Sequence, residues 1–247
     1  MLNIDKLFVS FQQPFGKLTV VKDLSVNVEK HDFISIIGCN GTGKSSLFKS
    51  IYGGVPFEKG RIELLGKSLF KEPIHDRLKK IAVVHQNIEL GSFGDMTLRE
   101  NLSLVLSKTN GKPWKKCLNY KSADLLKSLE LLPIDLKQHI DSPANCLSGG
   151  QRQAFNLLLA ILSKPDLLLL DEHTAALDPK SSDLIMEMTE ELVKKFQITT
   201  MMISHHLGHA IKYGNRLIVL RNGNIHKEYI KTQKSNLLES DLIKYFY

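Results

Sequence analysis

The chain has 247 residues, 43% of them hydrophobic, which is enough to bury a full core in one α/β unit carrying an insertion. No apolar run approaches the ~18 residues of a membrane span, and the N-terminus lacks the basic-then-apolar pattern of secretion, so we expect a cytosolic protein. The formal charge of +7 is compatible with nucleic acid, a membrane surface or plain solubility, and its short, scattered basic groups favour a solvated surface without a nucleic-acid partner.

The N-terminal part of the chain is rich in β-strand patterns. Leu2–Phe11 and Leu18–Val28 alternate apolar and polar residues, as half-buried antiparallel strands do. Phe33–Ile37 predicts a short, largely apolar strand, and Gly60–Gly66 another alternating one. Ile81–Val84 is a buried strand by its composition. These pieces predict an antiparallel β region beside a buried sheet.

Helical spacing begins near Met96, and leucines at three- and four-residue intervals predict an inserted helical subdomain. After it, Arg152–Leu162 predicts a helix with a polar first turn and a nearly all apolar remainder, and Lys180–Phe196 predicts an amphipathic helix. The remaining elements are the apolar strand Leu167–Leu170, the buried strand Ile198–Ile203, a hairpin over 216–230 and a short helix within 236–246. Alternating strands and helices of this kind predict an α/β fold with a mostly parallel sheet.

A glycine-rich stretch after the strand Phe33–Ile37 fits the pattern G-x-x-x-x-G-K-[ST], the P-loop, at Gly38–Ser45. Strand, glycine loop and helix is the context that confirms this motif. Its glycines let backbone N–H groups turn toward an anion, Lys44 would reach the β- and γ-phosphates, and Ser45 would bind Mg²⁺. The expected nucleotide contacts here are Gly38, Asn40, Gly41, Gly43, Lys44, Ser45 and Ser46. The motif predicts that the chain binds ATP with Mg²⁺.

Four apolar strands each end in residues able to handle a nucleotide: the P-loop, Gln86, Asp171-Glu172 and His205. Because ligands of parallel α/β sheets bind outside the carboxyl ends of the strands, we expect these residues to converge at one edge. Phosphoryl transfer needs positioning and charge neutralisation. We therefore expect Asp171 and Gln86 to join Ser45 around Mg²⁺, and Glu172, His205 and Gln86 to act on the attacking water.

A second glycine motif, Ser148-Gly149-Gly150-Gln151, precedes a helix without acids in its first turn. By the same reasoning as for the P-loop, it is a second anion site. Since the P-loop already holds one nucleotide, this second site makes sense if it closes over the nucleotide of another chain.

Neither the cysteines nor the histidine cluster indicates a metal site. Cys39, Cys117 and Cys146 are odd in number, widely spaced and free of C-x-x-C, which argues against a disulfide framework and against zinc. Histidines at positions i and i+4, as in 205–209, can bind one metal ion from the same face of a helix. No acidic or thiol partner lies nearby in the sequence, which argues against such a site.

Leu147–Gln151 between a P-loop and a Leu-Leu-Leu-Leu-Asp-Glu strand resembles the ATP-binding subunits of ABC transporters, over nearly the whole chain. The resemblance implies a P-loop NTPase core with an antiparallel β subdomain (1–95 and 163–230), a helical subdomain (96–162) and a C-terminal extension (231–247). It also implies a head-to-tail homodimer, or a dimer with a similar ATPase. Two ATP molecules would be bound, each between the P-loop of one chain and the signature motif of the other, Leu147–Gln151 with its Ser148-Gly149-Gly150.

The same resemblance implies further contacts. Asp178 would lie at the dimer interface, and Phe11 would stack on adenine, with Phe15 as its rival. Gln86 and the helical insertion would contact transmembrane permease subunits, which places the chain peripherally on the cytoplasmic face of the membrane. His173 stands where most members carry Pro, and Ala175 where most carry Ser, which puts one cross-dimer hydrogen bond in doubt.

The segment 171–179, Asp-Glu-His-Thr-Ala-Ala-Leu-Asp-Pro, is similar to stand-alone bacterial ATPases of uptake systems with a lipoprotein substrate-binding partner, some handling amino acids such as tryptophan. The resemblance therefore implies an ATP hydrolase that drives uptake. Two alternatives stay open at this point. One is a non-transport ABC ATPase such as an iron–sulfur assembly subunit, and the other is a nucleotide-binding regulator without turnover, which the presence of Glu172 and His205 disfavours.

Overall fold

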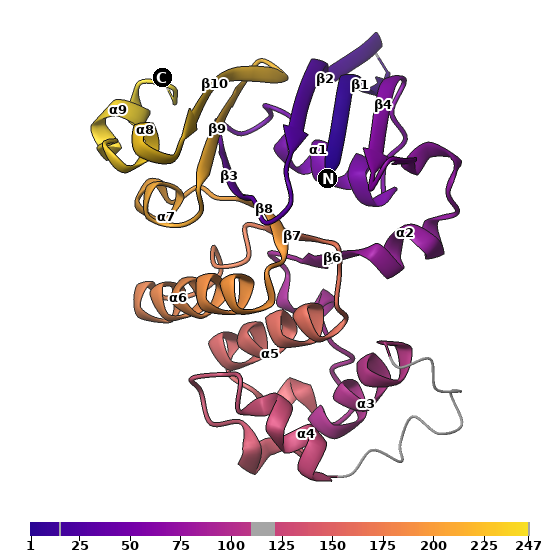
Figure 1. The fold of residues 1–247 in the computed structure, drawn as a ribbon, viewed down its shortest axis with the longest axis vertical. Helices are drawn as coiled ribbons and strands as arrows, with labels where there is room; N and C mark the ends of the chain where they lie inside the picture. The colour runs from indigo at the N-terminus through magenta and orange to yellow at the C-terminus, as the bar shows by residue number, and fades with distance from the viewer. Residues whose placement is uncertain (15, 110–121, 247) are drawn as a thin grey trace. The chain divides into compact units, whose positions relative to one another are not determined.

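The computed structural model describes residues 1–14, 16–109 and 122–246, which divide into two compact units (Figure 1). Unit 1 comprises Met1–Ile81 and Ile198–Tyr247, and unit 2 comprises Ala82–Gln197. Phe15, residues 110–121, which include Cys117, and Tyr247 lie outside the described residues. Each unit is described by itself below.

Unit 1 contains an antiparallel sheet built from the alternating segments near the N-terminus. Its strands, in the order β2-β1-β4-β5, are β2 (Gly16–Val28), β1 (Leu2–Gln13), β4 (Lys59–Leu64) and β5 (Lys67–Ser68). Strand β1 is antiparallel to both of its neighbours. Its apolar side chains Leu2, Ile4, Leu7 and Val9 are buried, which is the burial that the alternation predicts.

The second sheet of unit 1 carries the chain toward the P-loop. Its strands, in the order β10-β9-β3-β8, are β10 (Asn224–Ile230), β9 (Arg216–Arg221), β3 (Phe33–Ile37) and β8 (Thr199–Ile203). Strand β3 is parallel to both β8 and β9, and all of its residues are buried. The predicted hairpin is β9–β10, whose turn residues Asn222 and Gly223 have φ of 53° and 85°. Two positive φ angles are what a tight two-residue hairpin turn requires.

Five α-helices lie in unit 1: α1 (Lys44–Tyr52), α2 (Ile74–Lys80), α7 (Leu207–Lys212), α8 (Lys231–Ser235) and α9 (Glu239–Ile243), counted over the described residues. A 3₁₀ turn, η1 (Leu69–Lys71), precedes α2. The short helix that the sequence predicts within 236–246 is α9, and α8, which the sequence analysis does not predict, precedes it. Leu242 and Tyr245 of this segment pack with Ile37, the last residue of β3.

Unit 2 holds two neighbouring strands and the helical insertion. The strands are β6 (Ile81–Val84), whose first residue belongs to unit 1, and β7 (Leu167–Asp171). The α-helices of its described residues are α3 (Leu98–Thr109), α4 (Ser122–Leu129), α5 (Gly149–Leu162) and α6 (Pro179–Phe196). Short 3₁₀ turns are η2 (Ile88–Leu90), η4 (Lys137–His139) and η5 (Ala144–Cys146). Helix α5 packs against α3 and α6, which explains why most of its residues are buried.

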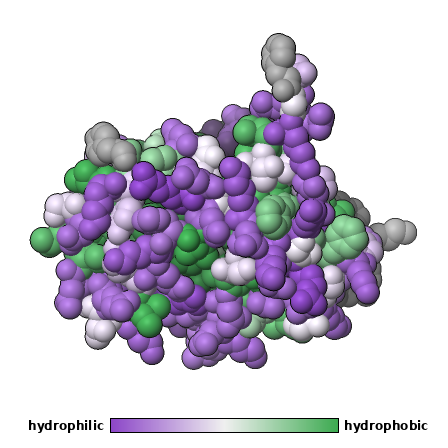
Figure 2. All heavy atoms as spheres, turned by 90° about the horizontal axis from the view of Figure 1, so that it is seen from above, coloured by the Kyte–Doolittle hydropathy of each residue, from purple (hydrophilic) through white to green (hydrophobic). Residues whose placement is uncertain are grey.

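One face of the described surface is mostly hydrophilic. Figure 2 shows purple side chains over most of one face, with separate green hydrophobic patches between them. Within residues 1–14, 16–109 and 122–246, no helix has the length and apolar character needed to cross a membrane.

Candidate active site

The P-loop joins β3 to α1 in unit 1, and its glycines are required by the backbone. Gly38, Gly41 and Gly43 have φ of 154°, 78° and 92°, a region that favours glycine. A Cβ at Gly38 would lie 2.4 Å from the carbonyl oxygen of Leu220, and one at Gly43 would lie 2.4 Å from that of Val20. The loop is therefore packed between the backbones of β9 and β2, and larger residues would displace it.

Lys44 turns its ammonium back over the loop. The side chain is buried, and Nζ donates to the carbonyl oxygens of Gly38 at 2.8 Å and Cys39 at 2.9 Å. Helix α1 begins at this lysine, has no acidic residue in its first turn and has no side-chain cap at Gly43. The N–H groups of its first turn therefore face the loop. Backbone donors, a helix N-terminus and a held cation together fit a bound polyphosphate.

His205 emerges from β8 at the same sheet edge as the P-loop. Ile203 pairs with Ile36 in the parallel β3–β8 ladder, and the N–H of Ser204 donates to the carbonyl oxygen of Ile36 at 3.1 Å. Both strands therefore end at the same edge, one in the P-loop and the other in His205. The predicted convergence is thus present for the two strand ends that belong to unit 1.

The neighbouring histidines have structural contacts. The N–H of His209 donates to Nδ1 of His206 at 3.2 Å, which caps α7, and the two rings stack with centroids 4.0 Å apart. Over the described part of the chain, no group of three or more His, Cys, Asp or Glu side chains is arranged to hold a metal ion.

Phe11 lies on β1 opposite Leu18 of β2, and its side chain is 37% exposed. A cavity of about 420 Å³ borders it, with Pro56 and Phe57 in its wall. An exposed aromatic ring beside a cavity has the geometry for stacking on a base. Phe15, the rival for this contact, lies outside the described residues.

Asp171 and Glu172 end β7 in unit 2. Glu172 has a φ of 50°, an unusual left-handed conformation for a residue with a side chain. Its carbonyl oxygen accepts from the N–H of Ala175 at 2.9 Å, which closes a turn after the strand. Gln86 follows the neighbouring strand β6, and its side chain is exposed.

The sequence did not single out Gln153, which connects these two segments. Its Nε2 donates to the carbonyl oxygen of His173 at 2.6 Å and to that of His85 at 3.3 Å. The available signal in the sequence was an amide side chain where the apolar part of the helix begins. Gln153 is fully buried, and a buried amide must find hydrogen-bond partners.

The Ser148-Gly149-Gly150-Gln151 motif forms the N-terminus of α5. The Ser148 hydroxyl oxygen accepts from the N–H of Gln151 at 3.4 Å, and the N–H of Ser148 donates to Oε1 of Gln151 at 3.0 Å. This capping box fixes the helix start, so Gln151 is used within the motif. The helix again has no acid in its first turn, which suits an anion.

Asp178 caps the next helix, α6. Its Oδ1 accepts from the N–H of Ser181 at 3.1 Å, and hydrogen bonding by Ser181 holds the pKa of the Asp178 carboxyl below its usual value. A Cβ at Gly150 would lie 3.3 Å from Oγ of Ser181, so the N-termini of α5 and α6 lie side by side. Unit 2 therefore holds the signature motif, Asp178, Gln86, Asp171 and Glu172, and unit 1 holds the P-loop, Phe11 and His205.

Comparisons with known proteins agree with these motifs. The family described as ABC transporter matches residues 21–175. The chain is 41% identical over 247 residues to the tyrosine transport ATP-binding protein of Clostridioides difficile (strain R20291), covering 100% of this chain and 98% of that protein. It is 31% identical over 237 residues to the methionine import ATP-binding protein MetN of Lactococcus lactis subsp. lactis (strain IL1403), covering 91% of this chain and 64% of MetN.

Solved structures show the same fold. The dimeric ATP-binding cassette MJ0796 bound to ADP and Pi has a TM-score of 0.78 at 23% identity, covering 93% of this chain and 98% of that one. The cbiO1 structure from Clostridium perfringens, part of the transporter complex cbiONQ, has a TM-score of 0.78 at 24% identity, covering 99% and 91%. The predicted fold class, a P-loop core with an antiparallel β subdomain and an inserted helical subdomain, is confirmed.

Proposed function

The chain belongs to the ABC transporter family, and on that premise we propose that it hydrolyses ATP to drive solute uptake through a separate permease. The observation that carries this is the P-loop with its buried Lys44, on a chain that matches a transport ATP-binding protein over its whole length. That relative is named for tyrosine transport, and the segment 171–179 resembles uptake ATPases for amino acids such as tryptophan. An aromatic amino acid is therefore the first solute to test.

The P-loop and the acidic strand end divide the chemistry between them. Lys44 and the N–H groups at the start of α1 would bind the β- and γ-phosphates, and Ser45, Asp171 and Gln86 would hold Mg²⁺. When bound, Mg²⁺ neutralises charge on the phosphate oxygens. Glu172 would accept a proton from the attacking water. These roles rest on the motifs and on the position of each residue at a strand end or helix start.

His205 would assist Glu172 in the hydrolysis step. It lies exposed directly after β8, at the edge where β3 enters the P-loop. An imidazole N–H there would donate to a γ-phosphate oxygen and orient the attacking water. Phe11, with its exposed ring, would stack on the adenine.

The second glycine motif supports a composite site. The N-terminus of α5, with Gly149 and Gly150 and no acidic side chain, would bind the phosphates of the nucleotide held by a second copy. Asp178, beside this motif through Ser181, would lie at the interface of a head-to-tail dimer. The related cassette MJ0796 is itself dimeric, which supports pairing.

A groove in unit 2 offers a place for the permease. A cavity of about 400 Å³ is lined by apolar side chains from β6, α3 and α5, among them Val83, Val105 and Leu159. Leu90 and Phe93 at its edge are 65% and 66% exposed, which is unusual for large apolar residues in water. We assign this groove to a short helix of the permease, because a helix presents an apolar face of matching character.

The proposed transporter includes a permease in the membrane and a substrate-binding protein. The chain would sit on the cytoplasmic face of the membrane, held there by the permease. An extracytoplasmic substrate-binding protein, a lipoprotein in the resembling subgroup, would deliver the solute. Both placements rest on the resemblance, and the import named for the relative MetN supports uptake as the direction of transport.

The deciding experiment is affinity purification from solubilised membranes, followed by transport into vesicles. We expect a membrane-spanning permease to co-purify in stoichiometric amount, and ATP-dependent accumulation of labelled tyrosine or another aromatic amino acid. A Glu172→Gln protein in the same vesicles is the control and should not accumulate solute. Recovery of only soluble partners would overturn the transport proposal and favour the alternative, a non-transport ABC ATPase such as an iron–sulfur assembly subunit.

A further inference from the structure

Gln153 holds together two segments that carry proposed active-site residues. It lies on α5 between the polar first turn and the apolar remainder of the helix, and it is fully buried. Its single amide nitrogen donates to two carbonyl oxygens, those of His173 at 2.6 Å and His85 at 3.3 Å. His85 directly precedes Gln86, and His173 directly follows Glu172. One side chain therefore bridges the loops after β6 and β7.

The loop after β7 needs such a support, because Glu172 has a φ of 50°. A left-handed conformation at a residue with a side chain costs free energy and persists only when its surroundings hold it. The carbonyl of His173 lies immediately beyond this strained residue. A hydrogen bond to that carbonyl fixes the peptide plane between His173 and Thr174, one peptide beyond Glu172, and so restricts the movement of the turn that Glu172 begins.

The same loop is anchored on its other side by the ring of His173. This ring is buried, and its Nε2 lies 3.2 Å from Oγ1 of Thr189 on α6. The Thr189 hydroxyl donates its proton to the carbonyl oxygen of Ile185 at 2.6 Å, so it accepts from the His173 ring. The residue after Glu172 is thus bound to α5 through its carbonyl and to α6 through its ring.

The loop after β6 is also held at a second point. Nδ2 of Asn156, one helical turn beyond Gln153, donates to the carbonyl oxygen of Ile88 at 2.7 Å and lies 3.5 Å from Oε1 of Gln153. Asn156 also lines the groove that we assign to the permease. The two amides therefore connect the groove wall, the Gln86 loop and the Glu172 loop within unit 2.

We propose that Gln153 is a positioning residue for ATP hydrolysis, whose amide sets the Gln86 and Glu172 loops at a fixed separation. The inference rests on the proposed function, because it assumes that Glu172 acts on the attacking water. It goes beyond that function in assigning a role to a residue outside the nucleotide-binding motifs. Gln153 touches neither nucleotide nor water in this role and acts through the two backbone carbonyls.

The test compares the ATPase kinetics of Gln153→Leu with those of the wild type, in the permease complex. Leucine keeps the side-chain bulk and removes both hydrogen bonds. We expect kcat to fall ~10-fold or more through misplacement of the reacting groups, while the KM for ATP and the Kd of an ATP analogue stay within about twofold. Leu157→Val, fully buried on the same helix, is the matched control for lost packing and should keep its kcat.

A second variant, Gln153→Glu, keeps the test decisive if Gln153→Leu does not fold. A protonated carboxyl donates one hydrogen bond, whereas a carboxylate donates none and is repelled by both carbonyl oxygens. We therefore expect the ratio of variant to wild-type kcat to rise as the pH is lowered from 8 toward 6. A pH-independent ratio would contradict the positioning role.

The remaining outcomes separate this inference from the proposed function. Wild-type kcat in Gln153→Leu, or an equal loss of kcat in Leu157→Val, would overturn the positioning role while leaving the ATPase intact. A wild-type complex that does not hydrolyse ATP would instead overturn the proposed function, and the inference with it.

Discussion

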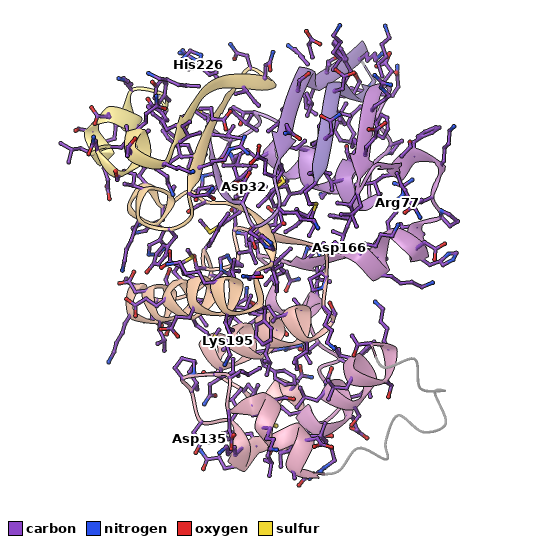
Figure 3. The ribbon with its side chains drawn as sticks, viewed as in Figure 1. Asp32, Arg77, Asp135, Asp166, Lys195 and His226 are labelled. Carbon is purple, nitrogen blue, oxygen red and sulfur yellow. The ribbon has the colours of Figure 1, made fainter. Side chains whose placement is uncertain are left out.

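Asp32 and Arg216 form an ion pair at the beginning of β3, with Oδ2 and Nη1 2.5 Å apart and both side chains largely buried. Asp32, labelled in Figure 3, also accepts from Nδ2 of Asn215 at 2.8 Å, and Arg216 also bonds Glu228 of β10. The network ties the starts of β3 and β9 to β10. Since the P-loop leaves the far end of β3, this network sets the strand on which the nucleotide site is built.

The first prediction concerns this network. Asp32→Asn should lower the free energy of unfolding by about 2 kcal/mol, because it weakens charge-assisted hydrogen bonds in a buried place. Asp76→Asn, which removes an exposed partner of Lys79, is the control and should leave stability unchanged. Denaturant unfolding at pH 7 measures both variants, and an unaltered midpoint in Asp32→Asn would contradict the prediction.

The same carboxylate predicts a pH dependence. Burial alone would raise the pKa of Asp32, but hydrogen bonds from Asn215, the N–H of Glu29 and Arg216 outweigh it and lower the pKa below its usual value. A carboxyl with a lowered pKa contributes stability above its unfolded pKa of about 3.9, and this is lost as the pH falls through the folded value. The stability difference between wild type and Asp32→Asn should therefore shrink below about pH 4, as unfolding at several pH values would show.

A third prediction concerns Glu172. Glu172→Gln should reduce ATP turnover by ~10²–10⁴-fold, since it removes a general base while keeping the size of the side chain. Binding of a fluorescent ATP analogue should be retained, because the phosphates are held by the P-loop. Unchanged turnover in this variant would show that another group accepts the proton.

The fourth prediction concerns the packing of the P-loop. Gly43→Ala should weaken ATP binding at least ~10-fold, which corresponds to ~1.4 kcal/mol, because its Cβ would overlap the carbonyl oxygen of Val20 at 2.4 Å. Gly66→Ala is the control, since Gly66 has a similar φ of 75° but no atom within 4 Å of an added Cβ. Gly66→Ala should lower the stability of the protein without weakening ATP binding. Titration with an ATP analogue measures the affinity of both variants.

The fifth prediction tests the composite site. Ser148→Arg should abolish hydrolysis and spare nucleotide binding, because Ser148 would contact only the nucleotide of the second copy. For the wild type, activity per molecule should rise with protein concentration where the dimer is weak. Ser148→Asn is the control for loss of the helix cap, because Asn can still cap the N-terminus of α5. Normal hydrolysis by Ser148→Arg would rule out the composite site.

Local patterns in the sequence predicted most elements of the fold. Alternating residues predicted β1 and β2, the apolar run Leu167–Leu170 predicted β7, and the glycine motif predicted the P-loop between β3 and α1. These predictions are correct because each pattern depends on residues that are close together in the chain. The C-terminal segment was less predictable: the sequence predicts the helix α9 within 236–246 but not α8 before it, and α8 packs against β9, β10 and α7.

The sequence by itself determined the family motifs, and from them it predicts which residues carry the chemistry: Lys44, Ser45, Asp171, Glu172 and His205. Only the tertiary structure revealed what holds some of them in place. Gln153 meets the carbonyl of His173 from 20 residues away, and Arg216 meets Asp32 from 184 residues away. Such partners have no local signature, because a buried amide or guanidinium is satisfied by whichever backbone or carboxylate the folded chain brings to it.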